Sequence, residues 1–186
     1  MRQEVVAEIE RDYIHRLSRE GKRLDGRGLE EHRPIEYEIN PISTAEGSAR
    51  VRMGNADVMV GVKMATGTPF PDTPDKGVLT TVAELRPVAY EYFETGPPRP
   101  NSIEIARVVD RGLRESKMID MSKLCIEEGE KVWVTFIDIH AIDHDGNLIG
   151  AAGIAALLAL MNTTVPAERF EVGDDFPMPV EHYPIP

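Results

Sequence analysis

The chain has 186 residues, of which 41% are hydrophobic and 28% are charged, and its formal net charge is −11. These values are ordinary for a soluble globular protein of about one domain. They exclude a protein that binds nucleic acid over its whole surface, so any nucleic-acid contact has to come from a local basic cluster or from a surface that a partner completes.

The first predicted element is a helix over residues 3–19, because apolar residues recur there at spacings of three and four. Gly21 ends this helix, and the sequence Arg23-Leu-Asp-Gly-Arg27 forms a turn. We therefore expect residues 1–20 to form a helical arm and residues 21–186 to form the main domain.

The next predicted segments have the alternation and the turn residues of strands. They are an extended segment at 35–39, a hairpin of strands 48–53 and 58–64 that turns at Gly54-Asn55, a loop at 65–76, and a strand at 78–85.

A helix is predicted over residues 102–117, with Asn101 or Ser102 as its N-cap. Helical geometry puts apolar residues on one face, namely Ile105, Val108, Val109, Gly112 and Leu113. Arg107, Arg111 and Arg114 stack on the opposite face. This stack is either a solvated face with pairs such as Asp110–Arg114 and Arg111–Glu115, or a ladder of guanidinium groups that follows a phosphate backbone.

The last predicted elements are a buried strand at 131–142, a polar turn at 143–147 and an almost wholly apolar helix at 149–161. A helix that is apolar on every side is expected to be buried by its neighbours. The order of strands and helices predicts an α+β domain with a sheet packed against helices.

No disulfide can form within the chain, because Cys125 is its only cysteine, and this suits a reducing cytoplasm. The N-terminus lacks the apolar core of a signal peptide. The longest apolar run, 149–161, is too short to cross a bilayer. We expect a cytoplasmic protein without membrane contact.

The residues alone reveal no complete active site. His140, Asp143 and Asp145 invite a metal hypothesis, but their spacing does not match a calcium loop, so an ordinary polar turn is favoured. Cys125 has the surroundings of a packed strand rather than those of a nucleophile. Glycine-rich phosphate motifs are absent, so no metal and no cofactor are expected.

Several motifs in order resemble the RNase PH superfamily. Its opening signature is matched by Arg23-Leu-Asp-Gly-Arg27 with Glu31, Arg33 and Pro34. Ala45-Glu-Gly-Ser-Ala49, Gly54-Asn-Ala-Asp-Val58, Ser102-Ile-Glu-Ile105 and the junction after Asp145-Gly continue the match. The resemblance extends from about residue 20 to 165. It implies an RNase-PH-type fold, similar to domain 2 of ribosomal protein S5, with the superfamily's C-terminal domain missing from this chain.

Within the superfamily, residues 106–117 most resemble the non-catalytic ring subunit of the archaeal exosome. Catalytic members carry two arginines before the Ser-x-Glu-Ile segment, where this chain has Pro100-Asn101. They also place a Gly-Ser/Thr-Arg phosphate loop at the start of the buried helix, where this chain has Gly146-Asn147-Leu148. The resemblance therefore implies a protein with no catalytic residue of its own.

The same resemblance implies partners. One is a catalytic RNase-PH-like subunit that pairs with this chain, and three such pairs form a hexameric ring. The others are RNA-binding cap subunits and single-stranded RNA, which is degraded in the 3′-to-5′ direction. Arg107, Arg111 and Arg114 are the implied RNA-binding residues.

Three further arginines, Arg23, Arg27 and Arg99, are candidates for RNA or interface contact. For the first two, ion pairs that tie the turn at Asp25 to the domain are the favoured interpretation. Two alternatives for the whole chain remain: a self-sufficient phosphorolytic exoribonuclease or nucleotidyltransferase, and a ring spacer that does not touch RNA.

Overall fold

The computed structural model describes residues 8–180, and the chain falls into two compact units that divide between residues 34 and 35. In the first unit, α1 (Glu8–Arg19) confirms the predicted N-terminal helix from residue 8 onward, and its predicted residues 3–7 lie outside the described part. Gly21, at φ 72°, ends α1, and the Lys22 amide donates to the Leu17 carbonyl at 2.9 Å. The proposed division of the chain after residue 20 stays a prediction.

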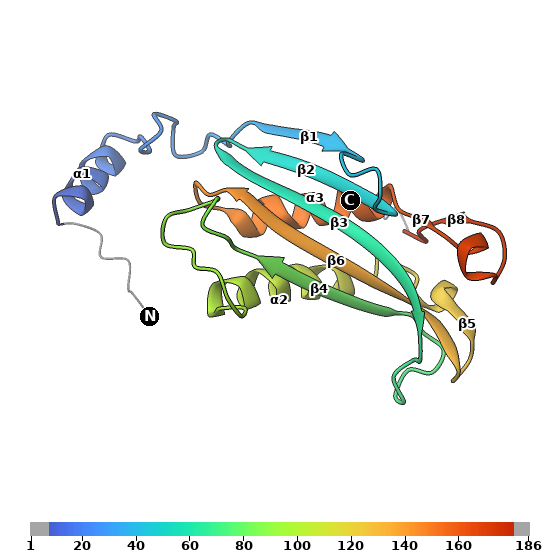
Figure 1. Cartoon of the computed structure of the whole chain (residues 1–186). Coiled ribbons are helices and arrows are strands. Elements are labelled where there is room, and N and C mark those ends of the chain that lie inside the picture. Colours follow the sequence, from blue (N-terminus) through green and yellow to red (C-terminus); the bar gives the residue numbers. More distant parts are fainter. Residues whose placement is uncertain (1–7, 181–186) are drawn as a thin grey trace. The chain divides into compact units, whose positions relative to one another are not determined.

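The second unit is built on one mixed sheet with the strand order β1-β2-β3-β6-β4 (Figure 1). All neighbouring strands are antiparallel except β4 and β6, which are parallel. The short β5 pairs antiparallel with the first residues of β6, Lys131 and Val132. The strands are β1 (Ile35–Ile39), β2 (Gly47–Met53), β3 (Ala56–Gly67), β4 (Val78–Glu84), β5 (Cys125–Glu127) and β6 (Lys131–Asp143).

Two helices, α2 (Pro100–Glu115) and α3 (Leu148–Met161), cover one face of this sheet (Figure 1). A 3₁₀ turn, η1 (Met121–Leu124), precedes β5. A second one, η2 (Glu168–Phe170), lies between the paired short strands β7 (Thr164–Val165) and β8 (Phe176–Pro177). The architecture confirms the predicted α+β class with a mixed sheet packed against helices.

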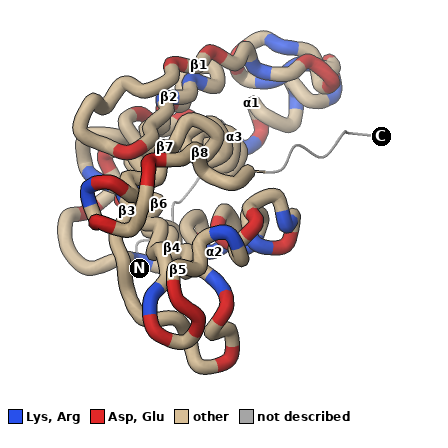
Figure 2. The backbone as a smooth tube through the Cα atoms, turned by 90° about the vertical axis from the view of Figure 1, so that its right-hand side faces the viewer, with Lys and Arg blue, Asp and Glu red and all other residues tan. Residues whose placement is uncertain are grey.

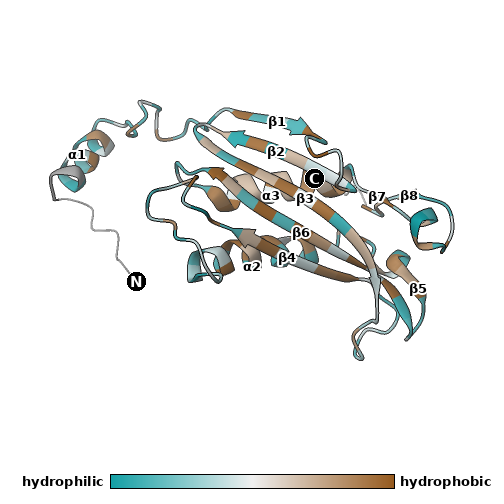
Figure 3. Cartoon of the chain, viewed as in Figure 1, coloured by the Kyte–Doolittle hydropathy of each residue, from teal (hydrophilic) through white to brown (hydrophobic). Residues whose placement is uncertain are grey.

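The core lies between the sheet and the two helices. In β2, Ala49, Val51 and Met53 are buried, while Arg50 and Arg52 between them are more exposed, as the period of two in a strand requires. The same alternation of hydrophobic residues is visible along β3 and β6 in Figure 3. From α3, alanines supply most of the buried surface, which lets the helix lie close to the sheet.

Three details of the sequence prediction were wrong. Residues 65–67 belong to β3 and not to the following loop, because they pair with residues 132–134 of β6. The start of α2 is Pro100 and not Ser102, because proline is well suited to the first helical position, and Arg99 is the N-cap residue. The uniform burial expected for α3 is also wrong, since Ile149 and Met161 are exposed.

The apolar face of α2 also differs from the prediction. The buried strip consists of Ser102, Ile105, Ala106, Val109 and Leu113. Val108 and Gly112, which the wheel had placed on this face, are exposed. The buried strip is therefore displaced round the helix, toward Ala106 and away from Val108 and Gly112.

Candidate nucleic-acid interface

The rotation of α2 about its own axis is fixed by polar contacts with β4. The Asp110 carboxylate accepts a hydrogen bond from the Thr81 hydroxyl at 3.1 Å and from Arg114 Nε at 2.7 Å. Arg114 Nη2 also donates to the main-chain carbonyl of Leu79. The predicted Asp110–Arg114 pair is thus confirmed, and it joins the helix to the strand.

The other two arginines of the predicted ladder are held differently. Arg107 and Arg111 are exposed, and among the described residues neither forms a hydrogen bond or an ion pair. The predicted Arg111–Glu115 pair is not formed. The ladder therefore separates into one arginine that is bound to the sheet and two whose guanidinium groups are available to an anion.

Charge is distributed unevenly along the chain. Residues 1–34 contain eight basic and eight acidic residues, so the net charge of −11 falls entirely on residues 35–186. Within that unit, residues 99–117 contain five basic and three acidic residues, whereas the rest contains eight basic and 21 acidic ones. Figure 2 shows acidic segments beside β5, at the end of the sheet that faces the viewer. The segment that includes α2 is thus a local basic cluster of the kind that an acidic protein needs to contact RNA.

Arg99 precedes α2 and forms an ion pair with Glu94. Both side chains are largely exposed, so this pair contributes little to stability, but it offsets the charge of Arg99.

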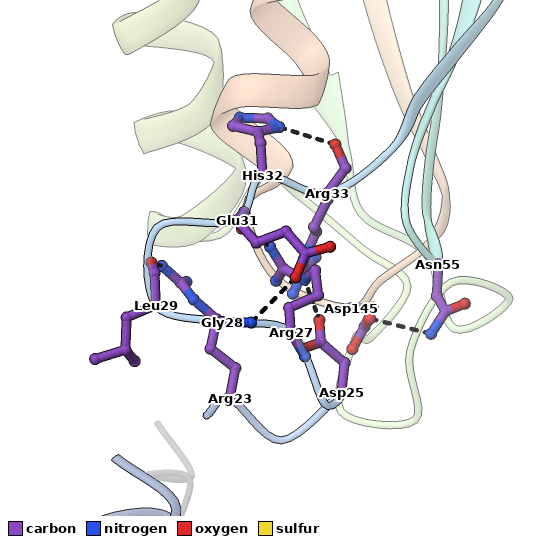
Figure 4. A network of polar contacts seen from close by, with 10 residues as sticks. All are labelled: Arg23, Asp25, Arg27, Gly28, Leu29, Glu31, His32, Arg33, Asn55 and Asp145. Atoms are coloured by element: carbon purple, nitrogen blue, oxygen red, sulfur yellow. Dashed lines mark hydrogen bonds and ion pairs between the residues drawn. The ribbon is translucent and has the colours of Figure 1, made fainter. Parts of the chain in front are cut away.

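Arg23 and Arg27 belong to a loop of the first unit that is bonded to itself (Figure 4). Arg27 Nε donates to Asp25 Oδ2 at 2.7 Å, and its Nη1 donates to the Glu31 carbonyl at 2.7 Å. Arg23 Nη2 donates to the Leu29 carbonyl at 2.5 Å. The hydrogen bond from Arg27 lowers the pKa of Asp25. These contacts favour a structural role for the two arginines in shaping this loop.

The start of α3 is the place where catalytic members of the resembled superfamily carry their phosphate loop. Here Asn147 adopts a left-handed conformation, with φ 55°, and its Nδ2 donates to the sulfur of Met53 at 3.0 Å. Leu148 is buried. A Cβ atom on Gly150 would lie 2.8 Å from Asn147 Oδ1, so the asparagine side chain occupies the space beside the first turn. Residues 146–148 thus offer no cationic side chain to a phosphate.

The turn before α3 is held by ring and polar contacts. The His144 ring lies against Tyr90, with ring centroids 4.8 Å apart, and its Nδ1 accepts from the Gly146 amide at 3.4 Å. Asn55 Nδ2 donates to Asp145 Oδ2 at 3.2 Å, which ties this turn to the β2–β3 hairpin (Figure 4). No group of three or more potential metal ligands occurs among residues 8–180.

One ionic cluster on the uncovered face of the sheet escaped the sequence analysis. Asp57 accepts hydrogen bonds from Arg50 at 2.7 Å and from Arg52 at 3.2 Å. Burial raises the pKa of Asp57, but the hydrogen bonds from the two arginines outweigh that effect, so this pKa lies below its ordinary value. The only sequence signal was the alternation of basic residues in β2, which does not reveal the carboxylate on the next strand.

The described helices include none that is long and apolar enough to cross a membrane.

Comparisons with known proteins agree with this geometry. The family described as "3′ exoribonuclease family, domain 1" matches residues 31–166. The chain is 56% identical to the exosome complex component Rrp42 of Archaeoglobus fulgidus over its whole length and 71% of that protein. It is 52% identical to the protein of the same name from Thermococcus kodakarensis, over 98% of the chain and 70% of that protein.

Solved structures give the same result. One is described as the Archaeoglobus fulgidus exosome with RNA bound to the active site; the match has a TM-score of 0.90 and 58% identity, and covers 93% of this chain and 68% of that one. A second, an archaeal exosome core, matches with a TM-score of 0.84 and 55% identity over 93% of this chain and 66% of that one.

Proposed function

Because the chain belongs to the 3′ exoribonuclease (RNase PH) family, we propose that it is a core-ring component of an archaeal-type exosome that binds RNA and does not cleave it. The observation that carries this proposal is that the guanidinium groups of Arg107 and Arg111, on the basic segment of an otherwise acidic unit, have no partner among residues 8–180. The names of its relatives support membership of the exosome.

The charges at the two helix starts of this chain do not suit cleavage of RNA. Phosphorolysis brings inorganic phosphate next to a phosphodiester, so two anions have to be neutralised in one small site. Helix N-termini provide partial positive charge and free N–H groups, but residues 100–101 and 146–148 add no cationic side chain. A single helix start does not suffice to hold both anions together.

The proposed partners follow from the family. A catalytic RNase-PH-like subunit pairs with this chain, three pairs form a hexameric ring, and cap subunits deliver single-stranded RNA. In this arrangement Arg107 and Arg111 hold the backbone of the RNA while the partner supplies the reacting groups. We propose a cytoplasmic location for the assembly.

The experiment that tests this function is phosphate-dependent shortening of a single-stranded oligoadenylate. It compares this chain alone, a catalytic RNase-PH-like subunit alone and the two mixed, each with and without inorganic phosphate. We expect the mixture to be much more active than either protein alone.

Shortening by this chain alone would overturn the non-catalytic assignment and favour the self-sufficient enzyme. If the mixture that contains the Arg111→Glu variant binds and shortens RNA as well as the mixture with the unchanged chain, that result would favour a ring spacer that does not touch RNA.

A further inference from the structure

The uncovered face of the sheet has two halves of different character. On β1 and β2 it carries charged side chains that lie opposite one another across the two strands, namely Glu36, Glu38, Arg50 and Arg52. Charged residues at alternate positions are typical of a sheet face that lies in water. The half formed by β4 and β6 differs, because apolar side chains occupy several of the corresponding positions.

We call this second part the β4–β6 half. It consists of the residues of the two strands that point away from the helices, namely Thr80, Val82, Glu84, Val134, Phe136, Asp138 and His140. Val82 is 40% exposed and Phe136 is 38% exposed. The two are diagonal neighbours across the strand pair, so their side chains lie within reach of each other. Together they form an apolar patch that another protein surface can cover.

Asp138 lies in the middle of this patch. Its partners across the sheet are Gly61 on β3 and Val82 on β4. Gly61 has no side chain, and the position of a Cβ atom on it lies 3.6 Å from Ile42 Cδ1. Asp138 is half-buried, and its carboxylate forms no hydrogen bond or ion pair among residues 8–180. The carboxylate therefore lies among apolar neighbours without a cation.

The nearby charged groups are already matched to one another. His140 Nδ1 lies 3.6 Å from Glu84 Oε2. On the neighbouring strand β3, Lys63 Nζ donates to Glu46 Oε1 at 2.8 Å. Within the described part of the chain, Asp138 is thus the carboxylate of the β4–β6 half that has no partner.

We infer that the β4–β6 half is a protein-docking surface, on which a neighbouring subunit of the ring places an arginine or lysine against Asp138 and apolar side chains against Val82 and Phe136. This inference rests on the proposed function and adds a surface that holds the assembly together. The partner has to supply a cation, because a carboxylate that loses its water at an interface is strongly destabilising unless it is paired.

The charges of this half disfavour the two other occupants. RNA is disfavoured because the carboxylates of Glu84 and Asp138 repel phosphate, and the β4–β6 half contains no arginine or lysine. A second copy of this chain is disfavoured because a two-fold contact centred on the patch would bring two Asp138 carboxylates together.

The test measures how tightly the chain binds a catalytic RNase-PH-like subunit. A fluorescently labelled catalytic subunit is titrated with the unchanged chain and with Asp138→Asn, Asp138→Arg and Phe136→Ser, and light scattering gives the mass of each complex. Glu36→Arg is the matched control, since Glu36 is an exposed carboxylate on the same face but in the half formed by β1 and β2. Urea unfolding is recorded for every variant.

We expect Asp138→Asn to weaken the complex by about tenfold or more, because it removes the charge that the partner's cation meets. Asp138→Arg should weaken it further, because it opposes that cation. Phe136→Ser should weaken it through the loss of apolar contact. Glu36→Arg should leave both the affinity and the mass of the complex unchanged.

A second measurement maps the surface while leaving Asp138 in place. In a Cys125→Ser background, which removes the native thiol, Val82→Cys and Glu36→Cys are each treated with a thiol reagent. Addition of the catalytic subunit should slow the reaction of Val82→Cys several-fold and leave that of Glu36→Cys unchanged.

Four results would overturn parts of this reasoning and can be told apart. If every variant binds like the unchanged chain and Val82→Cys stays reactive, the surface is wrong and the proposed function stands. If Phe136→Ser weakens the complex but Asp138→Asn does not, the partner supplies no cation. If Val82→Cys is protected in the chain alone, at twice the mass of one chain, the occupant is a second copy. If the unchanged chain does not bind the catalytic subunit, the proposed function fails and this partner with it.

Discussion

The division of the arginine ladder leads to a quantitative prediction about salt. For single-stranded nucleic acid, each neutralised phosphate contributes about −0.7 to the slope of log K against log salt concentration. Within the described part of the chain, the guanidinium groups of Arg107 and Arg111 have no partner, whereas Arg114 is bound to Asp110 and to the Leu79 carbonyl. The chain should therefore contribute about −1.4 to the slope through two arginines, not about −2.1 through three.

Replacing each of the three arginines in turn by alanine distinguishes a slope set by two arginines from a slope set by three. Arg107→Ala and Arg111→Ala should each make the slope about 0.7 less negative. When the salt concentration rises from 50 to 200 mM, each variant should therefore lose roughly 2.6-fold less affinity than the unchanged chain loses. Arg114→Ala should leave the slope unchanged. It should instead lower the free energy of unfolding by about 1 kcal/mol or less, because the side chain is partly exposed.

The assay is fluorescence anisotropy of a labelled oligoadenylate over a series of salt concentrations, with urea unfolding of each variant. Arg86→Ala is a suitable control, since Arg86 is an exposed residue outside α2 that pairs with Glu84. An Arg114→Ala slope that changes as much as that of Arg111→Ala would show that the contact with β4 does not withhold Arg114 from RNA.

Three further predictions concern stability. Thr135 is fully buried, and its hydroxyl has no hydrogen-bond partner among the described residues, so Thr135→Val should raise the free energy of unfolding by about 1–2 kcal/mol. Thr163→Val should lower it, because that hydroxyl donates to the Ala159 carbonyl at 2.8 Å; urea unfolding that ranks the two variants the other way round would contradict this assignment. Gly47→Ala should cost about 1–3 kcal/mol in the same assay, since its Cβ would lie 2.6 Å from the Ala159 carbonyl oxygen; an unchanged midpoint would contradict it. Because the pKa of Asp57 is lowered in the folded chain, its ionised form stabilises the fold above the ordinary carboxyl pKa of 3.8, and this stabilisation is lost as the pH falls through the lowered value; Asp57→Asn should be less stable than the unchanged chain at pH 7, with a smaller difference near pH 3.

Periodicity and turn residues were sufficient to predict most elements of the sheet and the three helices. The hairpin of β2 and β3 followed from alternation around Gly54-Asn55, and the strand preceding α3 followed from its β-branched residues. These signals are local, because each is set by the residues of a single element or turn.

Features that depend on distant residues were not accessible in this way. The spacing of Asp110 and Arg114 predicted their pair, but nothing local indicates that Arg114 also reaches a carbonyl 35 residues earlier in the chain. For the same reason the sequence alone grouped the three arginines as equivalent. The exposure of Val108 was missed because a helical wheel gives the apolar arc but not which side of that arc the sheet covers, and the covered side here includes Ala106.

The position of β6 in the sheet determines the order in which the second unit can fold during synthesis. The strands β1, β2 and β3 are neighbours both in the chain and in the sheet, so their hydrogen bonds can form as soon as residue 67 has emerged. The strand β4 emerges next but has no partner, because its neighbour in the sheet is β6, which ends only at residue 143. Until then both β3 and β4 present unpaired edges, and such edges promote association with other chains. The pairing of β6 with β3 and β4 is thus a late, long-range step, and the nascent chain remains prone to aggregation until it occurs.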